Sequence, residues 1–129
     1  MSYLSFEKLN QHLSSYDPQS SFFVVDKKVH ELWGDRLTCL SDKKVYFVTD
    51  PEASKSYACV EEIVTFFLEK GVKRNSKVIA IGGGALSDLA GYCASIVLRG
   101  VSWEVVPTTL LSLIDASIGG KTGINTPLD

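Results

Sequence analysis

The chain has 129 residues, of which 45% are hydrophobic and 22% are charged, and its formal net charge at neutral pH is −2. This length and composition are typical of one globular domain with its own hydrophobic core. The small net charge and the pI of about 5.7 exclude a broad electrostatic attraction to nucleic acid or to an anionic membrane. We therefore expect no nucleic-acid or membrane partner, and any anionic ligand must be bound by a local arrangement of residues.

The cysteines and the N-terminus indicate the compartment. Cys39, Cys59 and Cys93 are an odd number of widely spaced cysteines in apolar surroundings, without a CxxC pair, which favours buried free thiols in a reducing environment. The first residues show no basic flank followed by an apolar core, and no apolar run in the sequence approaches the ~20 residues that cross a bilayer. We expect a cytoplasmic protein.

Short apolar runs alternate with amphipathic segments along the chain. A short helix is expected near Phe6 to Leu13, strands over 22–25, 45–48, 78–81 and 103–106, helices over 29–40, 54–70 and 85–98, and an apolar helix over 110–118. Gly34 weakens the first long helix and indicates a break in it. The helix over 54–70 has an apolar stripe formed by Tyr57, Val60, Ile63, Val64, Phe67 and Leu68. This alternation predicts an α/β fold with a mostly parallel sheet and helices on both faces.

In parallel sheets of this kind, ligands bind beyond the carboxyl ends of the strands. The polar or glycine residues at those ends are Asp26, Asp50, Glu52, Gly82, Gly83, Gly84, Thr108 and Thr109. The three glycines follow a buried strand and precede a helix, so they can let an anion approach the free N–H groups of that helix. They match neither GxGxxG nor a P-loop, and on their own they fit a tight turn equally well. Asp88 can be a negative charge that stabilises the helix N-terminus, or it can contact a ribose or a nicotinamide.

Other polar residues also allow two interpretations. Thr108 and Thr109 can be caps of the next helix, and Arg99 before Gly100 can be a cation at a helix C-terminus. Asp115 lies in an apolar helix, where a charge needs a partner or a ligand. Lys121 lies in the glycine-flanked loop GGKTG, where it can meet a phosphate or carboxylate. His12 and His30 are interpreted as ordinary surface residues.

The segments GGGALSDLAG, LRGVSWEVVPTTLL and DASIGGKTGIN resemble the cofactor-binding part of the 3-dehydroquinate synthase family, the sugar-phosphate cyclases of the shikimate pathway. The resemblance is close from Val78 to Leu128, weaker at Asp26 and over 50–56, and absent before Phe22. It implies that residues 1–21 form a separate N-terminal segment and that residues 22–129 form a Rossmann-like NAD-binding domain.

The resemblance also implies a set of site residues, with NAD as a tightly held cofactor. By this resemblance the cofactor-binding residues are Asp26, Glu52, Lys55, Gly82, Gly83, Gly84, Ala85, Asp88, Thr108 and Thr109. Asp115 and Lys121 would face the substrate, and Arg99 would reach the substrate phosphate of the neighbouring subunit of a homodimer. The family's enzymes are lyases that convert 3-deoxy-arabino-heptulosonate 7-phosphate, a phosphorylated sugar acid, into 3-dehydroquinate and phosphate.

The sequence departs from the family pattern in several places. Lys28 stands where the family usually has an asparagine, and Pro51 stands where it has a glycine. The family's divalent metal, usually zinc, is bound in a helical C-terminal domain, and the chain ends before those ligands. We therefore expect no metal ligands in this chain and no activity of the chain by itself. The alternatives are a related cyclase such as a deoxy-inosose synthase, a metal-dependent polyol dehydrogenase, and a non-catalytic nucleotide-binding module.

Overall fold

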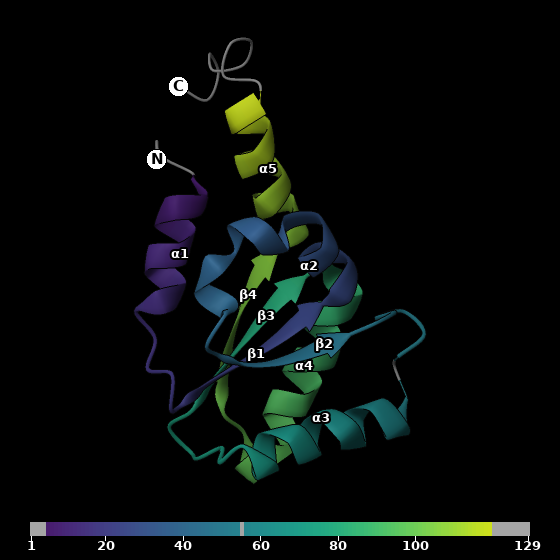
Figure 1. Cartoon of the computed structure of the whole chain (residues 1–129). Helices are drawn as coiled ribbons and strands as arrows, with labels where there is room; N and C mark the ends of the chain where they lie inside the picture. The colour runs from purple at the N-terminus through teal and green to yellow at the C-terminus, as the bar shows by residue number, and fades with distance from the viewer. Residues whose placement is uncertain (1–4, 55, 120–129) are drawn as a thin grey trace.

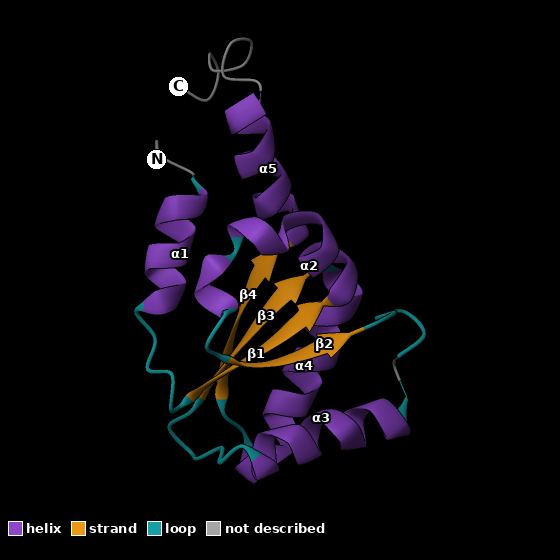
Figure 2. Ribbon diagram, in the orientation of Figure 1, coloured by secondary structure: helices purple, strands orange, loops and turns teal. Residues whose placement is uncertain are grey.

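The computed structural model describes residues 5–54 and 56–119, and it shows a parallel β-sheet between two layers of helices (Figures 1 and 2). In chain order the elements are α1 (Phe6–Ser14), β1 (Ser21–Asp26), α2 (Lys27–Trp33), the 3-10 helices η1 (Gly34–Arg36) and η2 (Thr38–Leu40), β2 (Lys44–Val48), α3 (Tyr57–Glu69), β3 (Lys77–Gly82), α4 (Gly84–Ile96), the 3-10 helix η3 (Val97–Arg99), β4 (Ser102–Pro107) and α5 (Thr108–Gly119). The predicted α/β class and the four predicted strands are confirmed.

The strands are all parallel and lie in the order β2-β1-β3-β4. Asp26 is level with Val48 across the first pair, and Gly82 is level with Pro107 across the last. The connection after β1 leads to β2 on one side of it, and the connection after β2 returns to β3 on the other side. The order of the strands therefore changes direction between β1 and β3. This switch point is where an open α/β sheet opens a crevice for a ligand.

The sheet buries apolar side chains on both faces. Phe23 and Val25 of β1 belong to a cluster with residues of α1, α2 and α5, whereas Phe22 and Val24 belong to a cluster with residues of α3 and α4. Successive strand residues point to opposite faces, and here both faces are covered by helices. That is why the central strands are unbroken apolar runs rather than alternating ones.

The helix predicted over 29–40 is shorter than expected. α2 ends at Trp33, and η1 and η2 follow it, so the break indicated by Gly34 is confirmed. A Cβ at Gly34 would lie 2.9 Å from His30 Nε2, and the ring centroids of His30 and Phe47 are 4.7 Å apart. His30 is exposed, as the sequence indicated, and its ring also packs against the ring of Phe47.

The predicted stripe of α3 is only partly correct. Ile63 and Phe67 are fully buried, but Tyr57 is 89% exposed and Leu68 is 53% exposed. Tyr57 is the first residue of α3, and that end of the helix extends beyond the sheet in Figure 1. Helical spacing alone predicts that Tyr57 is buried, but the sheet ends before it.

The three cysteines are free thiols in the structure. Cys39 and Cys93 are buried and Cys59 is half-buried. Burial raises the pKa of Cys93 to about 12 and also raises that of Cys39 above its ordinary value. A thiol held in its protonated form is a poor nucleophile and metal ligand, so these cysteines act as small core residues.

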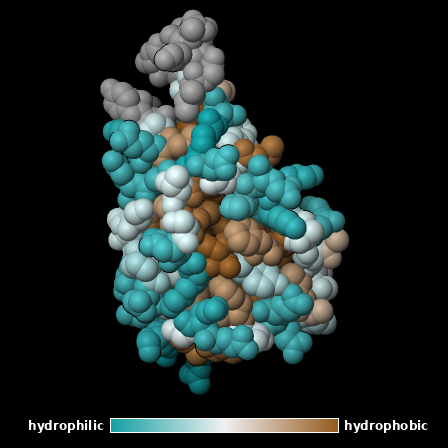
Figure 3. Space-filling model, in the orientation of Figure 1, coloured by the Kyte–Doolittle hydropathy of each residue, from teal (hydrophilic) through white to brown (hydrophobic). Residues whose placement is uncertain are grey.

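The surface in Figure 3 has hydrophobic side chains near the centre of the face, surrounded by hydrophilic ones. Among the described residues, none of the helices is both long and apolar enough to cross a bilayer.

Candidate cofactor site

A pocket of about 240 Å³ lies at the switch point, beyond the carboxyl ends of the strands. Its lining residues come from β1, from the loop after β2 and from the start of α4: Asp26, Asp50, Pro51, Glu52, Gly83, Gly84, Ala85 and Leu86. We call this pocket the cradle. It brings together five of the residues predicted to bind the cofactor, which are Asp26, Glu52, Gly83, Gly84 and Ala85.

The glycines make the cradle accessible. Gly83 is the N-cap of α4 in an extended conformation, and no side chain caps the helix there. A Cβ at Gly84 would meet nothing within 4 Å, and one at Gly83 would meet only the Thr108 hydroxyl at 3.8 Å. The first N–H groups of a helix have no partner within the helix and carry its positive dipole end. The cradle can therefore bind an anion such as a pyrophosphate through backbone N–H groups.

Gly82 has a different position from its two neighbours. It is buried at the end of β3, and a Cβ there would lie 2.8 Å from Leu86 Cγ and 3.1 Å from Asp26 Cβ. Close packing of α4 on β1 thus requires glycine at this position. Gly82 supports the cradle by letting the two elements approach, and it is not among the lining residues.

Local hydrogen bonds position the two segments that carry the acidic residues Asp26 and Glu52. Asp26 is the N-cap of α2, and its Oδ1 accepts a hydrogen bond of 2.9 Å from the Lys28 N–H. The loop after β2 is folded by the Ser54 N–H, which donates to the Asp50 carbonyl oxygen at 2.8 Å. These bonds place Asp26 and Glu52 on the same pocket. Carboxylates at the ends of the first strands of such folds accept hydrogen bonds from ribose hydroxyls.

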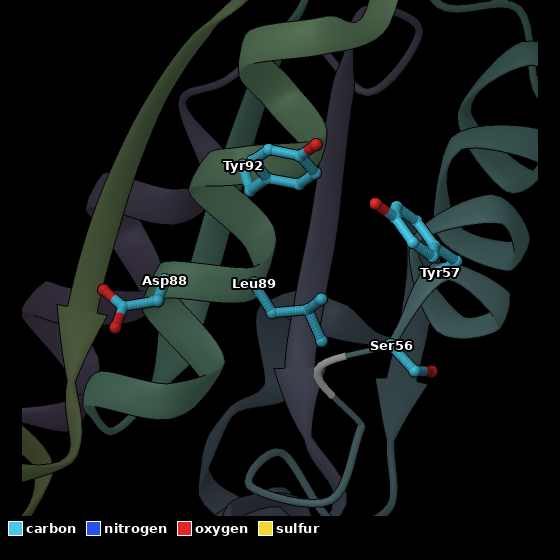
Figure 4. A pocket seen from close by; sticks show the side chains of 5 residues that line it. All are labelled: Ser56, Tyr57, Asp88, Leu89 and Tyr92. Atoms are coloured by element: carbon cyan, nitrogen blue, oxygen red, sulfur yellow. The ribbon is translucent and has the colours of Figure 1, made fainter.

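A second cleft, of about 380 Å³, lies between α3 and α4 and contains the predicted residue Asp88. The other lining residues are Ser56, Tyr57, Leu89 and Tyr92. In Figure 4 the two tyrosines extend towards each other from the two helices, Leu89 lies between them, and Asp88 points to the other side of α4. The sequence pattern indicates neither tyrosine as part of a cleft, since the spacing of Tyr57 predicts that it belongs to the apolar stripe of α3.

Thr108 and Thr109 begin α5 directly after β4. Thr108 lies close to the start of α4, because its hydroxyl oxygen would be 3.8 Å from a Cβ at Gly83. Both threonines also line a shallow apolar cleft with Ser112, Leu113 and Ala116 along α5. Thr108 is therefore the threonine that the structure places beside the cradle.

Two other predicted residues lie away from the cradle. Asp115 of α5 forms an ion pair with Arg36 of η1, which the sequence did not indicate. Arg99 is exposed at the far end of α4, and both Leu98 and Arg99 have positive φ angles of 49° and 69°. Such values in residues other than glycine cost roughly 1 kcal/mol or more each. Lys55 and Lys121 lie outside the described residues.

No group of three or more histidine, cysteine, aspartate or glutamate side chains able to hold a metal occurs within residues 5–54 and 56–119. The two histidines of the chain are engaged elsewhere, His12 near Tyr16 and His30 against Phe47. The described residues therefore do not fit the divalent metal implied by the resemblance, and no chemistry is assigned to a metal in this chain.

The sheet topology and the cradle at its switch point define an open α/β domain of the Rossmann-like class. Comparison with known proteins specifies it further: the family described as 3-dehydroquinate synthase N-terminal matches residues 45–129. The chain belongs to this family.

Individual relatives agree with the family match. The chain is 40% identical over 126 residues to the 3-dehydroquinate synthase of Clostridium tetani, which covers 92% of this chain and 34% of that protein. It is 59% identical over 76 residues to that of Methylacidiphilum infernorum, covering 59% of this chain and 21% of the relative. The chain thus spans about a third of the length of the curated relatives it matches.

A solved structure shows the same fold. The 2-epi-5-epi-valiolone synthase of Streptomyces hygroscopicus subsp. jinggangensis, with NAD+ and Zn2+ bound, superposes with a TM-score of 0.61 at 33% identity. The match covers 76% of this chain and 29% of that one. The shared fold is a Rossmann-like domain of the sugar-phosphate cyclases.

Proposed function

We propose that this chain is the NAD-binding part of a 3-dehydroquinate synthase, which converts 3-deoxy-arabino-heptulosonate 7-phosphate into 3-dehydroquinate and phosphate. The observation that carries the proposal is the cradle, because five residues predicted from the resemblance line one pocket at the switch point. The family match and the relatives named 3-dehydroquinate synthase support the particular reaction.

The chain's own residues would bind and orient the cofactor. The N–H groups at Gly83, Gly84 and Ala85 bind the pyrophosphate, and Asp26 accepts hydrogen bonds from the adenosine ribose. Glu52 and Lys55 lie along the cofactor, and Asp88, Thr108 and Thr109 orient the nicotinamide end. When bound, NAD supplies a reversible hydride acceptor, so the reaction has no net oxidation.

The residues beyond the cofactor would bind the substrate. Asp115 and Lys121 face the substrate, where a carboxylate can accept hydrogen bonds from sugar hydroxyls and an ammonium group can bind an anionic oxygen. Asp115 lies on α5, and Lys121 follows α5 in the sequence. This arrangement would place the substrate next to the nicotinamide end of the cofactor.

Arg99 supports a homodimer as the active form. α4 has 13 residues from Gly84 to Ile96, so it is about 20 Å long. Arg99 follows its far end and is too distant for the cradle of its own chain, whereas it can reach the substrate phosphate bound by a second copy. The positive φ of Leu98 and Arg99 is a backbone strain of the kind that clusters at functional sites.

The first test is a calorimetric titration of the isolated chain with NAD, comparing the wild type with Gly83→Asp. The substitution adds a carboxylate at the anion site, and we expect NAD affinity to fall by about 100-fold or more, since a like charge must be buried beside the pyrophosphate. Aspartate is a favourable N-cap, and space for its Cβ is available at Gly83. We therefore expect the variant to keep the fold, so that its loss of binding reports on the anion site.

Ser102→Asp is the matched control, because it adds the same charge at an exposed position at the opposite end of the sheet. We expect it to bind NAD as the wild type does. A wild-type chain that is folded but does not bind NAD would contradict the proposal, and so would a Gly83→Asp variant that binds normally.

The second test concerns turnover. We propose that the isolated chain does not release phosphate from the substrate, and that activity needs the metal-binding part of the enzyme. Fusing the chain to the part of the Clostridium tetani relative that follows the aligned region gives what we call the joined enzyme. Phosphate release by the joined enzyme without net NADH formation is expected, and steady NADH formation would instead indicate a polyol dehydrogenase.

A related cyclase is the second candidate, since the valiolone synthase structure is 33% identical and shares the fold. Sugar phosphates that lack the carboxylate of 3-deoxy-arabino-heptulosonate 7-phosphate distinguish the two. Preferential turnover of such a substrate by the joined enzyme would favour the second candidate.

A further inference from the structure

The ion pair between Arg36 and Asp115 joins two segments that are 79 positions apart in the chain. Arg36 Nη2 donates to Asp115 Oδ1, and the two side chains are 38% and 49% exposed. Asp115 thus stays accessible to a ligand while one of its oxygens is held by the guanidinium. Arg36 itself lies before residue 45, outside the part of the chain that the family match covers.

Arg36 is held in turn by α1. Its guanidinium carbon lies 4.4 Å from the centroid of the Phe6 ring, a cation–π contact. The side-chain amide of Asn10 donates to the Arg36 carbonyl oxygen at 2.8 Å and accepts from the Cys39 N–H at 3.1 Å. Side chain and backbone of Arg36 are therefore both fixed by residues of α1.

The segment that contains α1 is attached to the sheet at its other end. Tyr16, just after α1, donates to Glu104 Oε2 of β4 at 2.5 Å, and His12 Nε2 lies 3.5 Å from the same oxygen. Phe6, Leu9 and Leu13 are buried in the cluster that also contains Leu111 and Ile114 of α5. α1 and α5 thus share one core, with Arg36 between them.

We propose that Arg36 is a positioning residue for Asp115 and that α1 holds Arg36 in place. The inference rests on the proposed function, in which Asp115 faces the substrate. A carboxylate that orients a sugar hydroxyl must be held close to one geometry, since displacement by about 1 Å can cost up to 100-fold in rate. The ion pair engages Oδ1 of a half-exposed side chain, and the substrate binds to the rest of that carboxylate. The N-terminal segment from Phe6 to Tyr16, for which the sequence indicated no role, thereby acquires one.

The first experiment asks whether the pair forms in the isolated chain. Urea unfolding of the wild type, Arg36→Met, Asp115→Asn and the double variant gives a double-mutant cycle. We expect a coupling of about two- to fivefold in the folding equilibrium constant, the range of partly exposed ion pairs. Phe6→Leu, which keeps the apolar contact but removes the ring, should reduce this coupling. Absence of coupling would overturn the proposal.

The second experiment measures turnover of 3-deoxy-arabino-heptulosonate 7-phosphate by the joined enzyme. Arg36→Met should lower kcat by about tenfold, with NAD affinity unchanged because Arg36 is not among the residues of the cradle. Arg36→Lys should restore part of the activity, as it keeps the charge but loses the planar group over Phe6. Adding Arg36→Met to Asp115→Asn should cause no further loss, since Arg36 acts only through Asp115. Arg74→Met, at an exposed position between α3 and β3, is the control and should leave kcat unchanged.

The outcomes separate this inference from the proposed function. If Asp115→Asn loses activity but Arg36→Met does not, Arg36 has no positioning role and the proposed function stands. If the two losses add in the double variant, Arg36 acts independently and the inference is also overturned. A wild-type joined enzyme without turnover contradicts the proposed function, and the inference fails with it, whatever coupling the unfolding cycle shows.

Discussion

The two ends of the sheet use their polar groups in opposite ways. At the amino end, cations are paired within the protein: Lys44 Nζ donates to the carbonyl oxygens of Gln19 and Lys70 at 2.8 and 2.9 Å, and Lys77 Nζ lies 3.5 Å from Glu104. At the carboxyl end, the cradle presents backbone N–H groups and carboxylates to an open pocket.

This difference implies that the residues that determine stability and the residues that determine NAD affinity lie at opposite ends of the sheet. Groups that are satisfied within the fold contribute to the free energy of unfolding, whereas groups left for a ligand contribute only when the ligand is bound. Substitutions at the amino end should therefore change stability and leave NAD affinity intact, and most substitutions in the cradle should do the reverse.

Gly82→Val should be the exception to this rule and lower both stability and NAD affinity. Gly82 lies at the carboxyl end of the sheet, but it is packed as tightly as the core. A branched side chain would collide with Leu86 and Asp26, which lie 2.8 and 3.1 Å from the Cβ position. We expect a loss of about 2–3 kcal/mol in the free energy of unfolding, measured by urea titration, together with loss of NAD binding. Gly84→Ala is the control, since its Cβ would meet nothing within 4 Å. A stable Gly82→Val variant would show that α4 can move away from β1.

Asp26→Asn should lower NAD affinity and leave stability unchanged. Asparagine caps a helix about as well as aspartate, so the bond to the Lys28 N–H and the stability of α2 should be kept. The hydrogen bond to a ribose hydroxyl would lose its ionic character, and we expect NAD affinity to fall by about five- to tenfold. Calorimetry measures the affinity and thermal unfolding the stability. An unchanged affinity would place the ribose elsewhere.

Tyr16→Phe should have the smallest effect, limited to stability. It removes the hydrogen bond to Glu104 at the amino-end side of β4, which should cost about 0.5–1.5 kcal/mol at pH 7. NAD affinity should not change. A variant with weaker NAD binding would show that the two ends of the sheet are coupled.

The same variant should also alter the pH dependence of stability. Burial, followed by the hydrogen bond and charge of Glu104, raises the Tyr16 pKa from 10.0 to about 12. The stability linked to this group is therefore complete below pH 10 and is lost as the pH rises from 10 towards 12. Burial raises the pKa of Glu104, but the Tyr16 hydrogen bond and the Lys77 charge outweigh it, so the pKa lies below its ordinary value of 4.5.

The stability that Glu104 contributes is present above pH 4.5 and is lost as the pH falls below that value. In Tyr16→Phe, both the alkaline and the acid loss should be smaller than in the wild type. Urea unfolding of both proteins between pH 3 and pH 11 measures the difference. Parallel curves would contradict the assignment of these pKa shifts to the Tyr16–Glu104 pair.

Much of the fold could be predicted because its signals are local. β1 and β3 are continuous apolar runs, β2 and β4 are mostly apolar, and Gly34 marks the break after α2. Four of the residues that line the cradle, Asp26, Glu52, Gly83 and Gly84, are predicted to share one edge because the carboxyl ends of parallel strands meet there. Ala85 is predicted only by the family resemblance.

The remaining features depend on contacts between distant parts of the chain. Tyr16 meets Glu104 and Arg36 meets Asp115 only after folding, and no periodicity or spacing records such pairs. The exposure of Tyr57 follows from where the sheet ends, which the sequence of α3 does not contain. Lys55 and Lys121 lie outside the described residues, so their assigned roles stay predictions.

The central place of β1 has a consequence during synthesis. One edge of β1 pairs with β2, which follows it closely in the chain, but the other pairs with β3, from Ser21 opposite Lys77 onwards. At typical rates of translation, β3 is made roughly 3 to 11 s after β1. During that interval the apolar strand from Phe22 to Val25 has an unpaired edge, which is a template for association with other chains. The nascent chain therefore exposes a strand edge that can pair with other chains until β3 is available to cover it.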